Sequence, residues 1–364
     1  ALIGVDSTNS EIDNNSTVKS YIADGSTLTA AGALSVSASN NTRQRAEANS
    51  AAGGLVAAGV ATAEANTNTT THAYFGAGVT ATAGSVSIAA VSTDDNFADT
   101  TAGSGGVAAG AGASADTTNL SNTTAEIKSS SSVDGGVGAV TVGAVHTAKF
   151  NSKISTVSGG ALAGSGAVVD HTVTSNVTAN IGANTDVDAG SITITADNFA
   201  EKLNLGTNNI SGTTGGAVSG AGAVSTTTLR FTTQVTIGNG ASLDVDAGVL
   251  VDGDLILSAK NNYSIFDKIQ LITGGAISGA GVDSTIKTPT NIAKVSIGSA
   301  DLNSDGGITI SSRGEGSFVT KVNMETYGAG TLAVGDSVIS VTPDNDVIIE
   351  TGATLISLGD MKIS

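Results

Sequence analysis

Cysteine and tryptophan are absent from this 364-residue chain, and proline occurs only twice. Without cysteine, thiol catalysis and zinc-thiolate sites are excluded. Aromatic residues make up 3% of the chain, and charged residues make up 13%, against about 25% in a typical soluble domain. A thick core of bulky side chains is therefore excluded, because small residues fill little volume at each position. The composition favours a narrow interior.

Long apolar runs and positive charge are also scarce. No stretch of about 18 or more apolar residues occurs, so the sequence encodes no transmembrane helix. The formal net charge of −17 repels phosphate backbones and anionic lipid, which disfavours nucleic-acid binding. The chain starts without Met and without a basic, then apolar, signal stretch, so we expect a mature product or an excised fragment.

Glycine, with 48 residues, and the small or β-branched residues Ala, Val, Ser, Thr and Asn make up most of the chain. Such a composition raises the alternative of a disordered chain. Against it, 40% of the residues are hydrophobic and the β-branched ones alternate with polar ones, which provides apolar surface to bury.

Two anchors recur along the sequence. The first is a glycine pair followed by small or apolar residues and a further glycine. The pairs are spaced 52, 54, 56 and 59 residues apart and comprise Gly53 and Gly54, Gly105 and Gly106, Gly159 and Gly160, Gly215 and Gly216, and Gly274 and Gly275. The second anchor is an apolar residue, usually followed by Gly, that opens a run such as 181–194 and recurs from Ile22 to Ile348 in step with the glycine pairs. A fixed period of this kind indicates a repeat architecture.

These anchors divide the chain into one continuous array, 1–364. The predicted units are approximately 1–52, 53–104, 105–158, 159–214, 215–273, 274–327 and 328–364. Both ends cut through a unit and lack a polar capping unit, so we expect the array to continue beyond this chain or to dock end to end.

Within each unit the apolar residues alternate with period two, which is the signal of short β-strands, and no sustained helical stripe appears. Examples are Leu34 with Val36, Ile192 with Ile194, and Ile308 with Ile310. Polar clusters at 40–41, 93–96 and 260–262 are interpreted as turns. The sequence thus predicts an all-β parallel β-helix (β-solenoid) with about three coils of 18–20 residues in each unit of about 54 residues; two longer coils per unit are the alternative. About twenty such coils would form a rod on the order of 90 Å long.

The glycine pairs are interpreted as structural. Gly lets one wall of a narrow coil approach the other and lets the chain turn where φ must be positive.

The repeat resembles those of very large bacterial surface exoproteins, in particular filamentous-haemagglutinin-like and leukotoxin-like adhesins. The resemblance rests on an Ile-Gly run ending in Ala-Gly-x-Ile-x-Ile and on the Gly-Gly-Ala-x-Ser-Gly-Ala-Gly anchor, and it covers nearly the whole chain. It implies an extracellular, right-handed β-helix that serves as an adhesive stalk or matrix fibre.

Three histidines, His72, His146 and His171, lie in different parts of the repeat, and none has a partner at metal-ligand spacing. We expect solvent-facing or turn histidines and no catalytic role.

Carboxylates offer the one chemical alternative. The pairs Asp186 with Asp188 and Asp244 with Asp246 share a strand face at positions interpreted as equivalent in the repeat, which indicates a solvated acidic face that binds Ca²⁺ weakly at most. Further acidic pairs are Asp94 with Asp95 and Asp252 with Asp254. A β-helix carbohydrate-active enzyme would need a long irregular insertion with clustered Asp, Arg and Lys, and the only extra residues recognised are a few at 249–254.

The sequence therefore predicts a non-enzymatic, secreted structural or adhesive protein of the cell surface without a bound cofactor. Its expected partners are other copies of itself, joined end to end or laterally into filaments or a surface layer, and surface polysaccharide or a neighbouring cell surface. The alternatives are a carbohydrate-binding or carbohydrate-active β-helix and a calcium-stabilised adhesin module.

Overall fold

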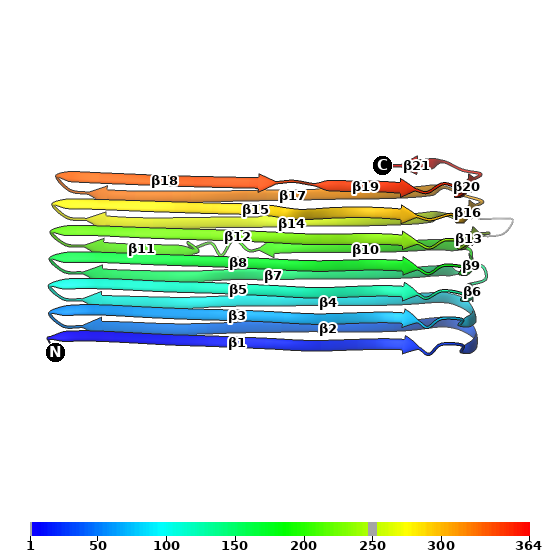
Figure 1. The fold of residues 1–364 in the computed structure, drawn as a ribbon, viewed down its shortest axis with the longest axis horizontal. Helices are drawn as coiled ribbons and strands as arrows, with labels where there is room; N and C mark the ends of the chain where they lie inside the picture. Colours follow the sequence, from blue (N-terminus) through cyan, green and yellow to red (C-terminus); the bar gives the residue numbers. More distant parts are fainter. Residues whose placement is uncertain (1, 247–252) are drawn as a thin grey trace.

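The computed structural model describes residues 2–246 and 253–364. In these ranges the chain is all β, and its strands pair in parallel to form an eight-stranded sheet, here sheet 1, and a thirteen-stranded sheet, here sheet 2. The strands stack as successive layers from the N-terminal to the C-terminal part of the chain (Figure 1). The predicted all-β, parallel architecture is confirmed. No helix in the described ranges has the length and apolar character needed to span a membrane.

Sheet 1 contains one long strand from each unit. In order these are β1 (Ile3–Ile22), β3 (Val56–Phe75), β5 (Ala108–Ile127), β8 (Leu162–Ile181), β12 (Val218–Ile237), β15 (Ile277–Ile297) and β18 (Gly330–Val341), with β19 (Asp344–Ile349) also paired to β15.

Sheet 2 contains the return strands and a set of short strands at one end. The return strands are β2 (Thr27–Gly53), β4 (Thr80–Gly105), β7 (Ala139–Gly159), β10 (Ser191–Lys202) with β11 (Ile210–Gly215), β14 (Leu255–Gly274), β17 (Ile308–Tyr327) and β21 (Met361–Ile363). The short strands are β6 (Ser132–Asp134), β9 (Asp186–Ala189), β13 (Ser242–Val245), β16 (Asp301–Ser304) and β20 (Thr354–Ser357).

Hydrogen-bonded neighbours are one whole repeat unit apart. Ile3 pairs with Val56, Val56 pairs with Ala108, and the same offset continues through Leu162 to Val218 and beyond. The chain runs once along sheet 1 and once back along sheet 2 in each unit. The predicted three coils of 18–20 residues are therefore wrong, as is the division into two coils, because one unit makes one circuit.

The polar segments interpreted as turns explain this error. Residues 40–41, 93–96 and 260–262 lie inside the long strands β2, β4 and β14. The alternation of buried and exposed residues continues through them, so their inward-facing members are buried polar side chains. Buried polar groups need hydrogen-bond partners, and the facing strand supplies them here.

The space between the sheets holds three apolar clusters. One fills the end near the short strands with Val, Ile, Leu and Ala, and includes Phe75. A second, at the glycine-pair end, is mostly alanine. A third lies between them and contains the aromatic residues Phe150, Phe231 and Tyr263. Small side chains at one end and larger ones elsewhere fit the predicted narrow interior.

Candidate functional site

The acidic residues singled out in the sequence lie on short strands of sheet 2. Asp188 on β9 is opposite Asp134 on β6 and Asp244 on β13, whereas Asp186 is opposite Ser132 and Ser242. The predicted equivalence of Asp186 with Asp244 is thus wrong by one pleat, because the pairing register aligns Asp188 with Asp244. Neighbouring strands are about 4.8 Å apart, so the three aligned carboxylates form an acidic ladder.

Partial burial, followed by the surrounding carboxylates of Asp244, Asp134, Asp186 and Asp246, raises the pKa of Asp188. Within the described residues, no group of three or more metal-ligating side chains is arranged to hold a metal ion. Weak calcium binding at Asp186, Asp188, Asp244 and Asp246 stays a prediction. The other proposed pair, Asp252 with Asp254, and the extra residues 249–254 lie partly outside the described residues.

The glycine pairs lie where sheet 2 strands end and sheet 1 strands begin. A Cβ on the second glycine of a pair would collide with the backbone of the preceding unit: Gly160 meets Gly106, Gly216 meets Gly160, and Gly275 meets Gly216. The first glycines, such as Gly215, have open space instead. None of the paired glycines has a positive φ. The close approach of successive turns is therefore what requires glycine, and the positive-φ explanation does not apply.

All three histidines were expected at the surface or in turns, and for two of them this is wrong. His146 and His171 have no exposed surface. Each is at an inward-facing strand position, as the period-two burial pattern of β7 and β8 requires. His72 faces outward and pairs with Glu126, with 2.9 Å between Nε2 and Oε1.

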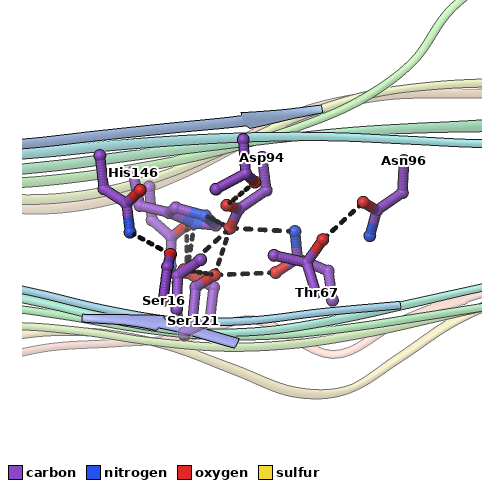
Figure 2. Close-up of polar contacts among 12 residues, drawn as sticks. Ser16, Thr67, Asp94, Asn96, Ser121 and His146 are labelled. Atoms are coloured by element: carbon purple, nitrogen blue, oxygen red, sulfur yellow. Dashed lines mark hydrogen bonds and ion pairs between the residues drawn. The ribbon is translucent and has the colours of Figure 1, made fainter. Parts of the chain in front are cut away.

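A polar cluster inside the array surrounds Asp94 (Figure 2). The Oδ1 atom of Asp94 accepts a hydrogen bond from Thr42 Oγ1 at 2.7 Å. Its Oδ2 atom is 3.0 Å from His146 Nε2 and accepts hydrogen bonds from the hydroxyls of Ser121 and Thr69 and the amide of Asn119. The strands of three successive units contribute these groups, so the cluster depends on the stacking register.

His146 continues the chain of contacts. Its Nδ1 atom is 2.6 Å from Ser175 Oγ, and Ser175 in turn bonds to Asn198 Oδ1 at 2.9 Å. Burial by itself raises the pKa of Asp94, but the hydrogen bond and charge of His146 and the hydroxyls of Ser121 and Thr42 outweigh burial, so the pKa is lowered. Asp94 thus favours its charged form.

The order Asp94, His146, Ser175 matches the connectivity of a catalytic triad, in which an acid orients a base that contacts a nucleophile. All three side chains are fully buried between the sheets, or very nearly so. A substrate would have to separate the two sheets to reach Ser175. The geometry therefore provides internal hydrogen bonding, and no reaction site is exposed at these atoms.

Sequence reasoning missed this cluster because it treated 93–96 as a turn. The signal was present in the sequence. Asp94 lies four residues after the buried Ala90, and His146 lies two residues after the buried Ala144, so both side chains point to the buried face of their strands. Asp95, with the opposite parity, faces outward and contacts Arg43 at 3.1 Å.

A shallow apolar groove crosses the outer face of sheet 1. On β5, β8, β12 and β15 its floor is a double row of outward-facing glycines, and on β8 and β12 exposed large apolar side chains form both rims. The floor on β8 and β12 consists of Gly164, Gly166, Gly220 and Gly222, and the rims there are Leu162, Val218, Val168 and Val224. A Cβ at Gly164, Gly166 or Gly222 would meet no atom within 4 Å, so the fold itself does not require glycine at these positions.

No protein-family model, curated protein or solved structure matches this chain.

Proposed function

We propose that this chain is a structural or adhesive segment of a large repetitive extracellular cell-surface protein, without catalytic activity, and that it associates laterally with copies of itself. The observation that carries the proposal is the continuous register, in which each unit adds one parallel strand to each sheet. Such a stack transmits load through rows of backbone hydrogen bonds. The resemblance of the repeat to surface exoproteins supports the extracellular location.

In this proposal the two sheets form a flattened β-solenoid. Right-handed winding is expected, because connections between parallel strands of one sheet nearly always take that hand. Solenoid repeats contact only their neighbours and stack into extended surfaces, which suits a stalk or fibre.

The glycine-floored groove is the surface proposed for lateral association, and a second copy of this chain is its proposed occupant. Each copy carries rims beside a groove, so a two-fold arrangement lets the rim of one copy enter the groove of the other. With strands about 4.8 Å apart and same-face residues roughly 6.7 Å apart, four rows over the four strands β5, β8, β12 and β15 cover roughly 500 Å². A stable interface buries about 800 Å² per partner, which a somewhat longer array provides.

The experiment compares sedimentation of the native protein with that of two variants of β8. Gly166→Lys places a positive charge on the groove floor, where a Cβ meets no other atom. Thr178→Lys places the same charge on the same outer face but outside the groove. We expect the native protein and Thr178→Lys to form dimers or larger assemblies. Gly166→Lys should raise the dissociation constant of the assembly at least tenfold and so favour the monomer. Monomeric native protein, or equal effects of the two variants, would overturn the proposed association.

A further inference from the structure

A buried ion pair joins the fourth and fifth units. Lys202 Nζ donates a hydrogen bond to Asp267 Oδ1 at 2.9 Å, and the two side chains are 0% and 1% exposed. The second oxygen of Asp267, Oδ2, accepts a hydrogen bond from Ser284 Oγ at 2.9 Å, across the interior from sheet 1. Ser284 is held in turn by Thr320 at 2.8 Å.

The pair lies beside a break in sheet 2. Lys202 ends β10 opposite Ile265, and pairing resumes where Ile210 meets Ile269. Between these points β14 has three residues, whereas the neighbouring chain has the seven residues 203–209, which leave the ladder as a loop between β10 and β11 (Figure 1). The sequence analysis did not identify these four residues, which the chain has in excess of β14. The ladder is interrupted from Leu203 to Asn208, and backbone hydrogen bonding to both neighbouring strands resumes at Asn209.

The surroundings of the pair are apolar. Ile265, the register neighbour of Lys202, belongs to the aromatic and aliphatic cluster with Phe231 and Ile286, so water is excluded. Holding an ammonium and a carboxylate out of water is costly, even when they are paired. Burial raises the pKa of Asp267, but the charge and hydrogen bond of Lys202 and the hydroxyls of Ser225 and Ser284 outweigh burial, so the pKa of Asp267 is lowered.

Proton transfer along the 2.9 Å hydrogen bond converts this pair into a neutral amine and a carboxylic acid in contact. An amine and an acid held in contact have a high effective concentration, which lowers the entropic part of the barrier to condensation. The hydroxyl of Ser284 is placed to stabilise the negative charge that develops on Oδ2 when the amine attacks Cγ. His171 stays neutral nearby, because burial and then the Lys202 charge lower its pKa well below the ordinary value, and it adds no competing cation.

We propose that Lys202 and Asp267 condense to an intramolecular isopeptide bond. The Lys202 Nζ–Asp267 Cγ bond forms and the Cγ–Oδ1 bond breaks. Oδ1 leaves as water with two protons from the original ammonium, so the reaction needs no oxidant, reductant or activated co-reactant. The product is a neutral secondary amide whose carbonyl oxygen keeps the hydrogen bond from Ser284.

The bond would link unit 159–214 covalently to unit 215–273 where the backbone ladder is interrupted. Formation of the bond does not depend on the proposed function, whereas its value, resistance to mechanical load, rests on that function. Mass spectrometry tests the bond and sedimentation tests lateral association, so one proposal can be wrong while the other holds.

Intact-mass spectrometry of the folded native protein tests the bond, after purification and again after prolonged incubation at neutral pH. We expect a mass lower by one water than the sequence requires, and a proteolytic fragment pair joined through Lys202 and Asp267. Lys202→Arg should restore the full mass, while Lys149→Arg, at a partly exposed ion pair with Glu201, should keep the lower mass. If Lys202→Arg fails to fold, the presence or absence of the cross-linked proteolytic fragment in the native protein tests the bond on its own. Full mass in the folded, incubated native protein would overturn the proposal.

Discussion

At the residue scale, Asp94 and Asp95 are neighbours in sequence with opposite surroundings. Asp94 is buried and contacts His146, Thr42 and Ser121, whereas Asp95 faces solvent beside Arg43, whose side chain is 81% exposed. Breaking a buried charged pair leaves its partners unsatisfied, but an exposed pair is weakened by solvent. The parity of the strand, and not the identity of the residue, decides the role of each carboxylate.

The pair of variants Asp94→Ala and Asp95→Ala tests this difference. We predict that Asp94→Ala lowers the free energy of unfolding by about 3 kcal/mol, because His146 and several hydroxyls lose their shared acceptor. Asp95→Ala should change it by less than about 1 kcal/mol. Urea unfolding monitored by circular dichroism measures both. Equal destabilisation by the two variants would show that Asp94 is not the centre of the internal network.

Element by element, the glycines divide into two kinds that sequence alone does not separate. The turn glycine Gly216 has a steric reason to be glycine, because a side chain would collide with Gly160, whereas the adjacent Gly215 has none. The groove glycines have no steric reason within the fold. Glycine in a strand interior costs stability, and it commonly marks a place where another backbone or ligand approaches closely.

Alanine substitutions at the two glycines of this turn test the difference between them. Gly216→Ala should destabilise the protein by about 2 kcal/mol or more, since the new methyl group forces the turns of two units apart. Gly215→Ala should stay within about 1 kcal/mol of the native protein. The melting temperatures of the two variants provide the measurement, and a similar loss in both would refute close approach as the reason for the second glycine.

The strands also show what the sequence could predict. The period-two alternation at Ile192 and Ile194 or Ile308 and Ile310 correctly indicated β-strands, because it reflects alternate burial within one strand, and the repeat correctly indicated their parallel stacking. It did not give strand length, because hydrogen bonding across the interior stabilises polar residues such as Asn261 inside β14. It also missed the Lys202–Asp267 contact, since the offset between paired residues is 56 where Asp186 meets Ser242 (242 − 186) but 63 where Lys202 meets Ile265 (265 − 202), so the contact departs from the repeat spacing.

For the whole molecule, the length of the circuit changes the expected shape. Twenty short coils would have formed a rod of roughly 90 Å, whereas seven layers about 4.8 Å apart stack to only about 30 Å. Strands of 20 residues span roughly 66 Å at about 3.3 Å per residue, so the described stack is broader along its strands than along its stacking direction. Any further unit would lengthen both the sheets and the apolar groove.

Excision of a unit tests whether one repeat unit makes one circuit of the two sheets. Removing residues 276–328 joins Gly275 to Ala329, which has in the next unit the position that Ala276 has in this one, and so preserves the register of every remaining strand. Removing residues 276–293, about one third of a unit, corresponds to one predicted short coil. We predict that cooperative thermal unfolding, followed by circular dichroism, survives the whole-unit deletion and is lost in the partial one. Cooperative unfolding of the partial deletion, with loss in the whole-unit deletion, would contradict the account.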